Sequence, residues 1–212
     1  MNIIDKSIYT NLELLPIDLS GWNGNCKIFK TLIEKIKPST IIEVGTWKGQ
    51  SAINMANIIQ QNNLNCNIYC VDTWLGALEF WDFAYDTPDR NLLQKNGYPQ
   101  IYYQFLSNVV HTNTQNIILP FPCTSLIAAR FFKHKKISAD LIYIDASHDE
   151  FDVYHDIKNY YSLLSEHGII FGDDYITFPG VALAVNKFTE EMNLSLNLTE
   201  HNFWIINKKT IS

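Results

Sequence analysis

Three acidic residues and one histidine lie just after two apolar runs of the chain. They are Asp145, His148, Asp173 and Asp174. The runs cover residues 141–144 and 168–171. If these runs are neighbouring parallel strands, they lie about 4.8 Å apart, and carboxylates at their carboxyl ends can reach one small cation. The pattern therefore predicts a metal-assisted active site, with the three aspartates as metal ligands.

The elements that must position these residues are visible as apolar runs that alternate with segments of helical period. This alternation is typical of a parallel sheet covered by helices on both faces. The expected strands are residues 40–44, 68–71, 117–119, 141–144 and 168–171. Two further segments, 194–198 and 203–206, predict an antiparallel closing pair. We therefore expect an α/β fold, a Rossmann-like, doubly wound, mostly parallel seven-stranded sheet with an antiparallel C-terminal edge pair.

The composition indicates one domain. The chain has 212 residues, of which 47% are hydrophobic and 18% charged, enough to bury one substantial core. Apolar residues at helical spacing before Pro38 predict a helix in the N-terminal part. We expect a single domain over residues 1–212, with a helical extension over 1–37 and the Rossmann-like core over 38–210.

Charge and cysteine usage narrow the range of partners and compartments. The net charge is −6 and no Lys/Arg-rich run is present, which argues against nucleic acid as a partner. The four cysteines form neither a CxxC pair nor a dense framework, a pattern typical of reduced thiols. With no secretory signal and no apolar run long enough to span a bilayer, we expect a soluble cytoplasmic protein.

The end of the first expected strand carries a glycine loop. Its sequence has the spacing E-x-G-x-x-x-G from Glu43 to Gly49, which differs from the GxGxxG pattern that cradles a pyrophosphate. This spacing favours a nucleoside-like cofactor that lacks pyrophosphate. The residues expected to contact that cofactor here are Glu43, Gly45, Thr46, Trp47, Gly49 and Ser51. Glu43 has a second reading, as an acceptor of hydrogen bonds from its own loop.

The ends of later strands complete the expected cofactor site. Asp72 follows the second strand, where an acid can accept both hydroxyls of a ribose, and Thr73 comes next. Beyond the third strand, Thr124 or Ser125 fits a helix cap better than a contact to adenine, and Ser125 is kept as a weaker candidate. Asp145 belongs to the cofactor site as well as to the metal site.

Together these motifs resemble those of the class I S-adenosylmethionine (SAM)-dependent methyltransferases. The glycine loop from Glu43 to Gly49 and the acid Asp72 carry the resemblance. Within that family, the chain is similar to the divalent-metal O-methyltransferases, first the macrocin or macrolide-sugar type and then the catechol type. The paired acids Asp173 and Asp174, and a general base three residues after the first metal aspartate, match the sugar type; the catechol type has a lysine where this chain has His148.

The resemblance implies a reaction and its cofactors. It implies SAM, a divalent cation that is Mg²⁺ or alternatively Mn²⁺, and a sugar, glycan or other small-molecule acceptor. A sugar hydroxyl is a poor nucleophile until its proton is removed, so a cation at Asp145, Asp173 and Asp174 would stabilise the alkoxide. His148, with an ordinary pKa near ~6.5, would accept the proton. A catechol-like acceptor is the nearest alternative.

Other classes of function fit parts of the same sequence. A non-catalytic assembly domain could keep the nucleotide fold, and a homo-oligomer or companion domains in a longer transferase are also compatible. A metal-dependent hydrolase could use Asp145 and His148. A second group of residues is similar to a phosphohydrolase-like His-Asp metal cluster, namely Asp149, Asp152, His155 and Asp156. Helical period with Val153, Ile157 and Leu164 as the buried stripe instead predicts that these acids lie mostly on a solvated face.

A long segment rich in aromatic residues follows Asp72. Its rings are Trp74, Phe80, Trp81, Phe83 and Tyr85, interleaved with Glu79, Asp82 and Asp86. The segment 73–88 is too long for an ordinary connection and must bury its rings somewhere. A substrate lid, a subunit interface and simple packing fit equally, and the early segment around Trp22 poses the same choice.

Overall fold

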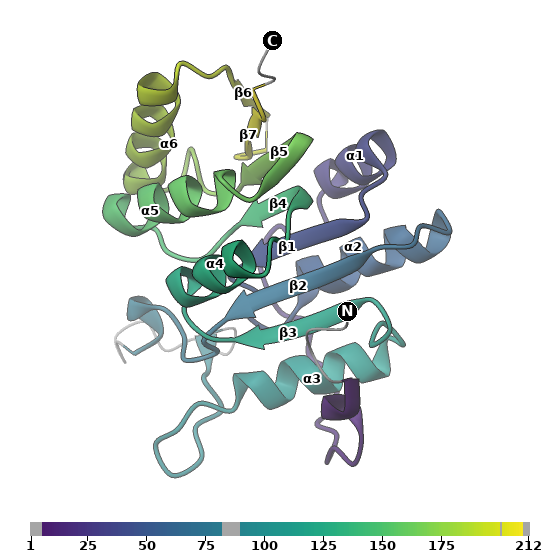
Figure 1. The fold of residues 1–212 in the computed structure, drawn as a ribbon. Coiled ribbons are helices and arrows are strands. Elements are labelled where there is room, and N and C mark those ends of the chain that lie inside the picture. The colour runs from purple at the N-terminus through teal and green to yellow at the C-terminus, as the bar shows by residue number, and fades with distance from the viewer. Residues whose placement is uncertain (1–5, 82–89, 200, 210–212) are drawn as a thin grey trace.

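A seven-stranded sheet forms the centre of the part of the protein that the structure describes. The structure, a computed structural model, describes residues 6–81, 90–199 and 201–209. The strands are β1 (Thr40–Val44), β2 (Asn67–Asp72), β3 (Ile118–Pro122), β4 (Ala139–Ile144), β5 (Leu164–Gly172), β6 (Leu196–Leu198) and β7 (Trp204–Asn207). Their order is β3-β2-β1-β4-β5-β7-β6, with β7 antiparallel to both β5 and β6 and the other pairs parallel (Figure 1). The predicted fold class is therefore confirmed.

Helices cover both faces of this sheet, as the alternation of the sequence predicts. They are α1 (Lys27–Ile36), α2 (Gln50–Gln61), α3 (Ile101–His111), α4 (Ser125–His134), α5 (Glu150–Tyr161) and α6 (Pro179–Met192), with short 3-10 helices η1 (Lys6–Tyr9) and η2 (Leu78–Phe80). Side chains of α1, α2 and α3 pack in one apolar cluster and those of α4, α5 and α6 in another. Each cluster lies on its own face of the sheet.

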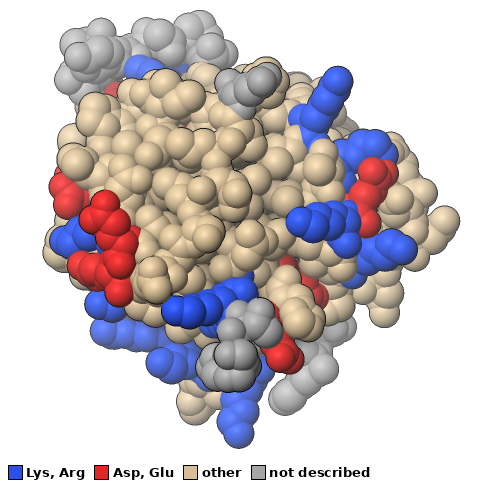
Figure 2. Space-filling view, turned by 90° about the horizontal axis from the view of Figure 1, so that it is seen from above, with Lys and Arg blue, Asp and Glu red and all other residues tan. Residues whose placement is uncertain are grey.

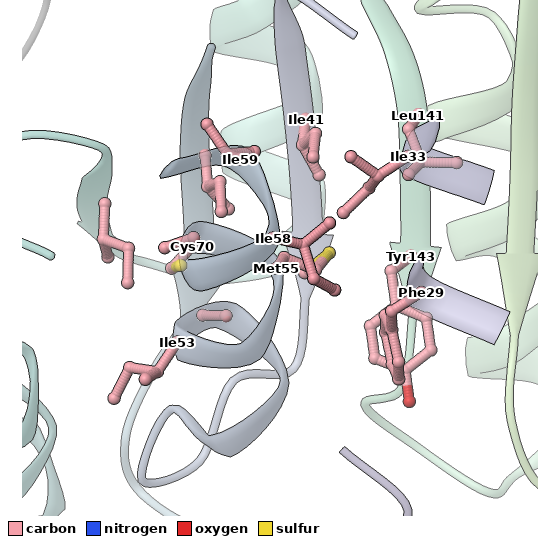
Figure 3. Close-up of a cluster of buried hydrophobic side chains, with 14 of the residues drawn as sticks. Phe29, Ile33, Ile41, Ile53, Met55, Ile58, Ile59, Cys70, Leu141 and Tyr143 are labelled. Carbon is pink, nitrogen blue, oxygen red and sulfur yellow. The ribbon is translucent and has the colours of Figure 1, made fainter. Parts of the chain in front are cut away.

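The first apolar cluster shows how the helical spacing meets the strands. In Figure 3, Phe29 and Ile33 of α1 lie against Leu141 and Tyr143 of β4. The ring centroids of Phe29 and Tyr143 are 5.0 Å apart, in an edge-to-face arrangement that aromatic pairs favour. Because Tyr143 is fixed by this packing, the end of β4 is held rigidly just before Asp145.

Two expectations for the segment after β4 are wrong. Leu164 does not belong to the helix: α5 ends at Tyr161, and β5 begins at Leu164, four residues earlier than the expected strand. Asp156 is not solvated but only 6% exposed. As the i+3 neighbour of Val153, it shares the buried stripe of α5, where the Ser125 side chain bonds to it.

The N-terminal part is less helical than expected. Of the extension predicted over residues 1–37, the described residues form η1 and α1, whereas residues 12–21 lie in neither a helix nor a strand. We call residues 12–24 the N-terminal strap. Polar side chains of α3 bond to its backbone, among them Gln104, whose Nε2 donates to the carbonyl oxygen of Pro16 at 2.8 Å. The strap is therefore fixed by side chains rather than by its own secondary structure.

The lengths of the helices and the charge of the surface relate to the expected partners, membranes and nucleic acid. No helix among the described residues is long and apolar enough to cross a bilayer. Figure 2 shows one face of the molecule, on which Lys and Arg side chains lie mainly near the margin and uncharged residues occupy the centre. On this face the basic residues thus surround the centre without covering it.

Candidate functional site

The acidic residues are brought together by the pairing of β4 with β5. These two strands are parallel, and Ile144 is the register partner of Gly172. Asp145 and Asp173 each follow one of these partners, so they leave the same edge of the sheet side by side. The predicted neighbour relation of the two strands is confirmed.

One small cavity joins the four residues singled out from the sequence. Asp145, His148, Asp173 and Asp174 all line it, and its apolar wall includes Trp204. Its volume is about 10 Å³, enough for about one particle the size of a water molecule. The structure thus places the predicted acids and base around one common space.

Burial, followed by the crowding of negative charge, determines the electrostatics of this pocket. Burial and repulsion by Asp174 and Asp173 raise the pKa of Asp145 to about 8, although the Tyr143 hydroxyl donates to Asp145 Oδ2 at 2.8 Å. Asp173 is 4% exposed, and burial raises its pKa as well. Its Oδ1 accepts from the backbone N–H of Asp174 at 2.7 Å, and its Oδ2 accepts from Nδ2 of Asn23 at 2.8 Å.

His148 lies between two acids. Its Nε2 is 3.1 Å from Oδ2 of Asp174, and its Nδ1 is 3.3 Å from Oε1 of Glu79. The imidazole also stacks on the ring of Phe178, with centroids 3.8 Å apart and planes at 9°. Burial alone would lower the pKa of His148, but the hydrogen bond to Asp174 and the nearby negative charges raise it. A ring nitrogen that bonds to a carboxylate carries a proton, so it must lose that proton and leave its acid before His148 can accept a proton from a ligand.

The predicted metal ligands share a pocket but are not gathered around one point. Within residues 6–81, 90–199 and 201–209, no three His, Cys, Asp or Glu side chains form a group that could hold a metal ion. Asp174 pairs with His148, and Asp173 pairs with Asn23. The donor set is nevertheless chemically suited to a hard divalent cation, since it is all carboxylate oxygen and its mutual repulsion is what a cation would relieve. The metal site stays a prediction.

The glycine loop after β1 has the backbone conformation that its sequence predicts. Gly45 and Gly49 have φ values of +83° and +90°, in the left-handed region that favours glycine. The loop is held by Asp72, whose Oδ2 accepts from the backbone N–H groups of Thr46 and Trp47 at 2.8 and 2.9 Å. Each carboxylate oxygen can accept further hydrogen bonds, so the role of Asp72 toward a ribose stays a prediction.

Glu43, near the end of β1, supplies a buried carboxylate at the start of this loop. It is 0% exposed, and its Oε1 accepts from the hydroxyl of Ser51. Its Oε2 and the hydroxyl of Thr46 are buried and make no hydrogen bond of ordinary geometry within the described residues. Burial raises the pKa of Glu43 to about 7, although the Ser51 hydroxyl lowers it. A buried acceptor without a partner suits a cationic group of a ligand.

This raised pKa gives a testable pH dependence of stability. The unfolded chain releases the proton of Glu43 near pH ~4.3, whereas the folded chain keeps it until about pH 7. The folded state therefore binds more protons between these values, and Glu43 lowers the free energy of unfolding as the pH rises through that window. We expect Glu43→Gln to remove roughly 2–3 kcal/mol of the decline between pH 5 and pH 8.

Urea unfolding of the wild type and of Glu43→Gln at both pH values measures this difference. Glu166→Gln, at an exposed position of β5, is the matched control and should follow the wild type. Equal declines in the wild type and in Glu43→Gln would show that Glu43 ionises as freely in the folded chain as in the unfolded one.

Comparison with known families shows the family to which this chain belongs. A family model described as a methyltransferase domain matches residues 42–175, more than half of the chain. The chain belongs to this methyltransferase family. The resemblance seen in the glycine loop and the strand-end acids is confirmed. Among curated protein sequences, none matches this methyltransferase.

Solved structures share the fold of this methyltransferase. An O-methyltransferase from Bacillus cereus, in complex with SAH, is 15% identical, with a TM-score of 0.61 and coverage of 95% of this chain and 88% of that one. TomG from Streptomyces achromogenes, an O-methyltransferase involved in tomaymycin synthesis and in complex with SAM, is 12% identical, with a TM-score of 0.61 and coverage of 97% and 86%. The O-methyltransferase NovP is 16% identical, with a TM-score of 0.59 and coverage of 87% and 79%. At these identities the likeness shows a common fold.

The remaining candidates for cofactor binding follow the ends of β2 and β3. Thr124 caps α4, since its hydroxyl accepts from the backbone N–H of Ile127 at 3.4 Å. Ser125 is the first residue of α4 and bonds to Asp156. Thr73 is exposed, and its hydroxyl accepts from the backbone N–H of Leu75 at 3.3 Å. Thr124 is thus the helix cap, and contacts of Ser125 and Thr73 with a cofactor stay predictions.

The aromatic segment after β2 divides between packing and the site. Trp74 is 2% exposed, and its indole Nε1 donates to the carbonyl oxygen of Trp47 at 2.8 Å, so it supports the glycine loop from within the core. The ring of Phe80 lies 4.7 Å from that of Trp47 and 6.1 Å from that of Trp22. Four members of the segment lie outside the described residues, namely Asp82, Phe83, Tyr85 and Asp86.

Three residues of the site were not assigned a role from the sequence. Tyr143 and Asn23 contact the acids, and Glu79 contacts His148. Asn23 and Glu79 are distant in sequence from the strand ends and carry no motif. Tyr143 could have been found, because it lies two residues before Asp145 on the same face of a strand.

Proposed function

We propose that this methyltransferase transfers the methyl group of SAM to a hydroxyl of a sugar or glycan in the cytoplasm. The observation that carries the proposal is the convergence of His148 with three aspartates in one pocket beside the glycine loop. A Cβ atom at Gly45 would lie 2.0 Å from the carbonyl oxygen of Asp145, so the loop and the pocket are in direct contact. A donor bound at the loop would thus adjoin an acceptor bound at the pocket.

The cofactor proposal rests on groups in and around the glycine loop. The unpartnered Oε2 of Glu43 suits the ammonium of the SAM methionine group, directly or through water. Asp72 would accept the ribose hydroxyls while holding the loop through Thr46 and Trp47. The B. cereus and S. achromogenes neighbours bind SAH and SAM in a fold of this kind, which supports the same cofactor class here.

His148 is the proposed general base. It lines the pocket, and its ring is oriented by Phe178 on one face and by Glu79 at Nδ1. Loss of the Nε2 proton to solvent, together with release of Nε2 from Asp174, would give that nitrogen a free lone pair to take the proton of an acceptor hydroxyl. The alkoxide formed in this way attacks the methyl group, whose bond to sulfur breaks, and the sulfonium leaves as a neutral thioether.

The three aspartates are the proposed ligands of a divalent cation, Mg²⁺ or Mn²⁺. Such a cation, when bound, supplies Lewis acidity and a template for two vicinal hydroxyls. Asp145 is oriented by the Tyr143 hydroxyl, and Asp173 by Asn23. A sugar offers vicinal hydroxyls together with an apolar ring face, and the half-exposed Trp22 next to Phe80 presents an aromatic surface of the kind that stacks on such faces.

Transfer of labelled methyl from SAM tests the function. The purified protein is incubated with Mg²⁺ and with separate sets of sugar nucleotides, glycosylated metabolites and catechols, and products are identified by mass spectrometry. We expect S-adenosylhomocysteine to raise the melting temperature, methylation in a sugar-containing set, and loss of turnover in EDTA that Mg²⁺ restores.

Each other result contradicts a defined part of the proposal. Methylation of catechols alone would replace the sugar acceptor, and turnover in EDTA would remove the metal. Binding of S-adenosylhomocysteine without transfer to any set would favour a non-catalytic domain. A melting temperature that S-adenosylhomocysteine leaves unchanged would contradict the use of SAM.

A further inference from the structure

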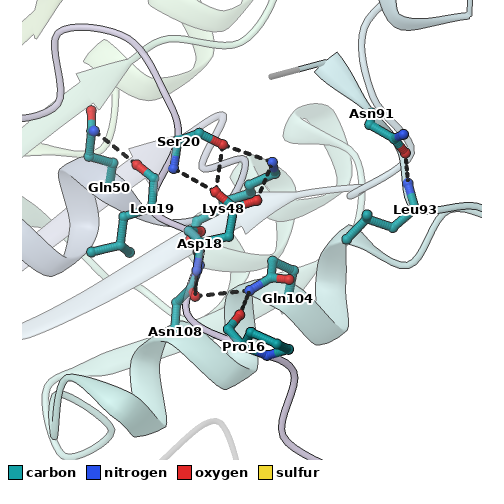
Figure 4. Close-up of polar contacts among 10 residues, drawn as sticks. All are labelled: Pro16, Asp18, Leu19, Ser20, Lys48, Gln50, Asn91, Leu93, Gln104 and Asn108. Carbon is teal, nitrogen blue, oxygen red and sulfur yellow. Dashed lines mark hydrogen bonds and ion pairs between the residues drawn. The ribbon is translucent and has the colours of Figure 1, made fainter. Parts of the chain in front are cut away.

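The N-terminal strap is joined to the glycine loop by a buried charge. Lys48 follows Trp47 in that loop, and its side chain is 1% exposed. Its Nζ donates to Oδ2 of Asp18 at 2.7 Å and to the hydroxyl of Ser20 at 2.9 Å (Figure 4). A buried ammonium is costly without an anion, so Lys48 requires the strap in this position. Lys48 therefore holds the strap and the glycine loop together.

Amide side chains hold the strap on both sides of this ion pair. Asn108 of α3 accepts from the backbone N–H of Asp18 at 3.0 Å and donates to the carbonyl oxygen of Lys48 at 2.8 Å. Gln50, at the start of α2, donates to the carbonyl oxygen of Leu19 at 2.9 Å, as Figure 4 shows. These bonds fix the strap over both α2 and α3.

The far end of the strap is fixed as well. The backbone N–H of Gly24 donates to Oε1 of Gln50 at 3.1 Å, and Nδ2 of Asn54 donates to the carbonyl oxygen of Gly24 at 2.9 Å. Asn23 therefore lies between two anchored residues, Ser20 and Gly24. Its φ of 52° is in the left-handed region, which asparagine tolerates better than most residues. This geometry delivers its amide to Oδ2 of Asp173 at 2.8 Å.

Asn23 is suited to holding a carboxylate in its charged form. An amide donor orients the oxygen and leaves the negative charge in place, whereas a cationic partner would neutralise it. The other oxygen of Asp173 is held by the backbone N–H of Asp174. The two donors together fix the plane of a carboxyl group that is 4% exposed and lines the pocket.

We propose that Asn23 is a positioning residue for methyl transfer, which acts by holding the Asp173 carboxylate, and that the strap completes the active site by linking this residue to the glycine loop. The inference rests on the proposed function. Partners that orient ligating carboxylates typically contribute 10- to 100-fold to activity or metal affinity. The strap would thus link the position of Asp173 to the glycine loop, where SAM would bind.

Two substitutions at Asn23 test the inference. Asn23→Gly removes the amide and keeps the left-handed backbone, and Asn23→Asp keeps the size but replaces the donor by a repelling acceptor. The matched control is Asn193→Gly, at an exposed left-handed position (φ 48°) that caps α6. We expect kcat to fall about tenfold in Asn23→Gly and further in Asn23→Asp, with KM for SAM within about twofold and melting temperatures close to that of the control.

Binding of Mn²⁺ to the cofactor-free protein, followed by electron paramagnetic resonance, gives a readout besides turnover. We expect binding of Mn²⁺ to weaken about tenfold or more in Asn23→Gly relative to the wild type. Equal kcat values in the wild type and both variants would overturn the inference, and so would full activity of Asn23→Asp alone, since a packing role needs only the size of the side chain. A wild type that transfers no methyl contradicts the proposed function and this inference with it; a wild type that transfers methyl but binds no Mn²⁺ contradicts the metal alone and leaves the order of kcat to decide.

Discussion

Replacement of His148 by alanine is expected to lower kcat by roughly 10²- to 10⁴-fold, the range that a general base contributes. The variant keeps Asp145 and the acid pair, but no group remains at that point of the pocket to take the proton of the acceptor hydroxyl. His148 is held by Asp174, Glu79 and Phe178 rather than by the glycine loop. Affinity for S-adenosylhomocysteine should therefore stay within about threefold of the wild type, as isothermal titration calorimetry would measure.

The control for this prediction is the exposed His155 of α5, whose Nδ1 lies 2.7 Å from the carbonyl oxygen of Phe151. His155→Ala should keep the turnover of the wild type. Added imidazole should restore part of the activity of His148→Ala, because a small base can occupy the space of the lost ring. A kcat within tenfold of the wild type, or a parallel loss of cofactor affinity, would rule out His148 as the base.

The fold could be predicted from the sequence because its main signals are local. The strand at residues 40–44 coincides with β1, since an apolar run bounded by Pro38 and Gly45 leaves little choice of limits. The start of β5 was missed because Ser165, Glu166 and His167 carry no apolar signal, although backbone pairing with β4 extends to Leu164. Pairing between strands, rather than side-chain type, sets that boundary.

The residues of the candidate site that directly follow strands could be predicted from the sequence. Those that lie in segments outside the sheet could not. Asp145 and Asp173 follow apolar runs, so the parallel sheet alone brings them together. Asn23 reaches the site from a loop and Glu79 from the short helix η2. The positions of such segments depend on contacts such as the ion pair of Lys48 with Asp18. Such contacts join residues far apart in sequence and have no periodicity that could reveal them.

Replacement of Gly45 by alanine is expected to reduce the affinity for S-adenosylhomocysteine by more than about 100-fold. The new Cβ would lie 2.0 Å from the carbonyl oxygen of Asp145, and both atoms belong to or adjoin the backbone, so no side-chain rotation relieves the clash. Either the glycine loop or the end of β4 must move. Because Asp72 holds the loop through the N–H groups of Thr46 and Trp47, a shift of the loop also breaks these bonds.

The chain offers a matched control that separates this clash from the strain of a left-handed alanine. Gly97 has nearly the same φ, +80° against +83° at Gly45, and an added Cβ there meets no atom within 4 Å. Gly97→Ala should therefore cost about 1–2 kcal/mol of stability and leave binding intact. If both variants lose affinity equally, the strain alone would account for the loss. If Gly45→Ala binds as tightly as Gly97→Ala, the contact between the glycine loop and Asp145 would not be needed for cofactor binding, and the placement of the donor beside the acid pocket would lose its structural basis.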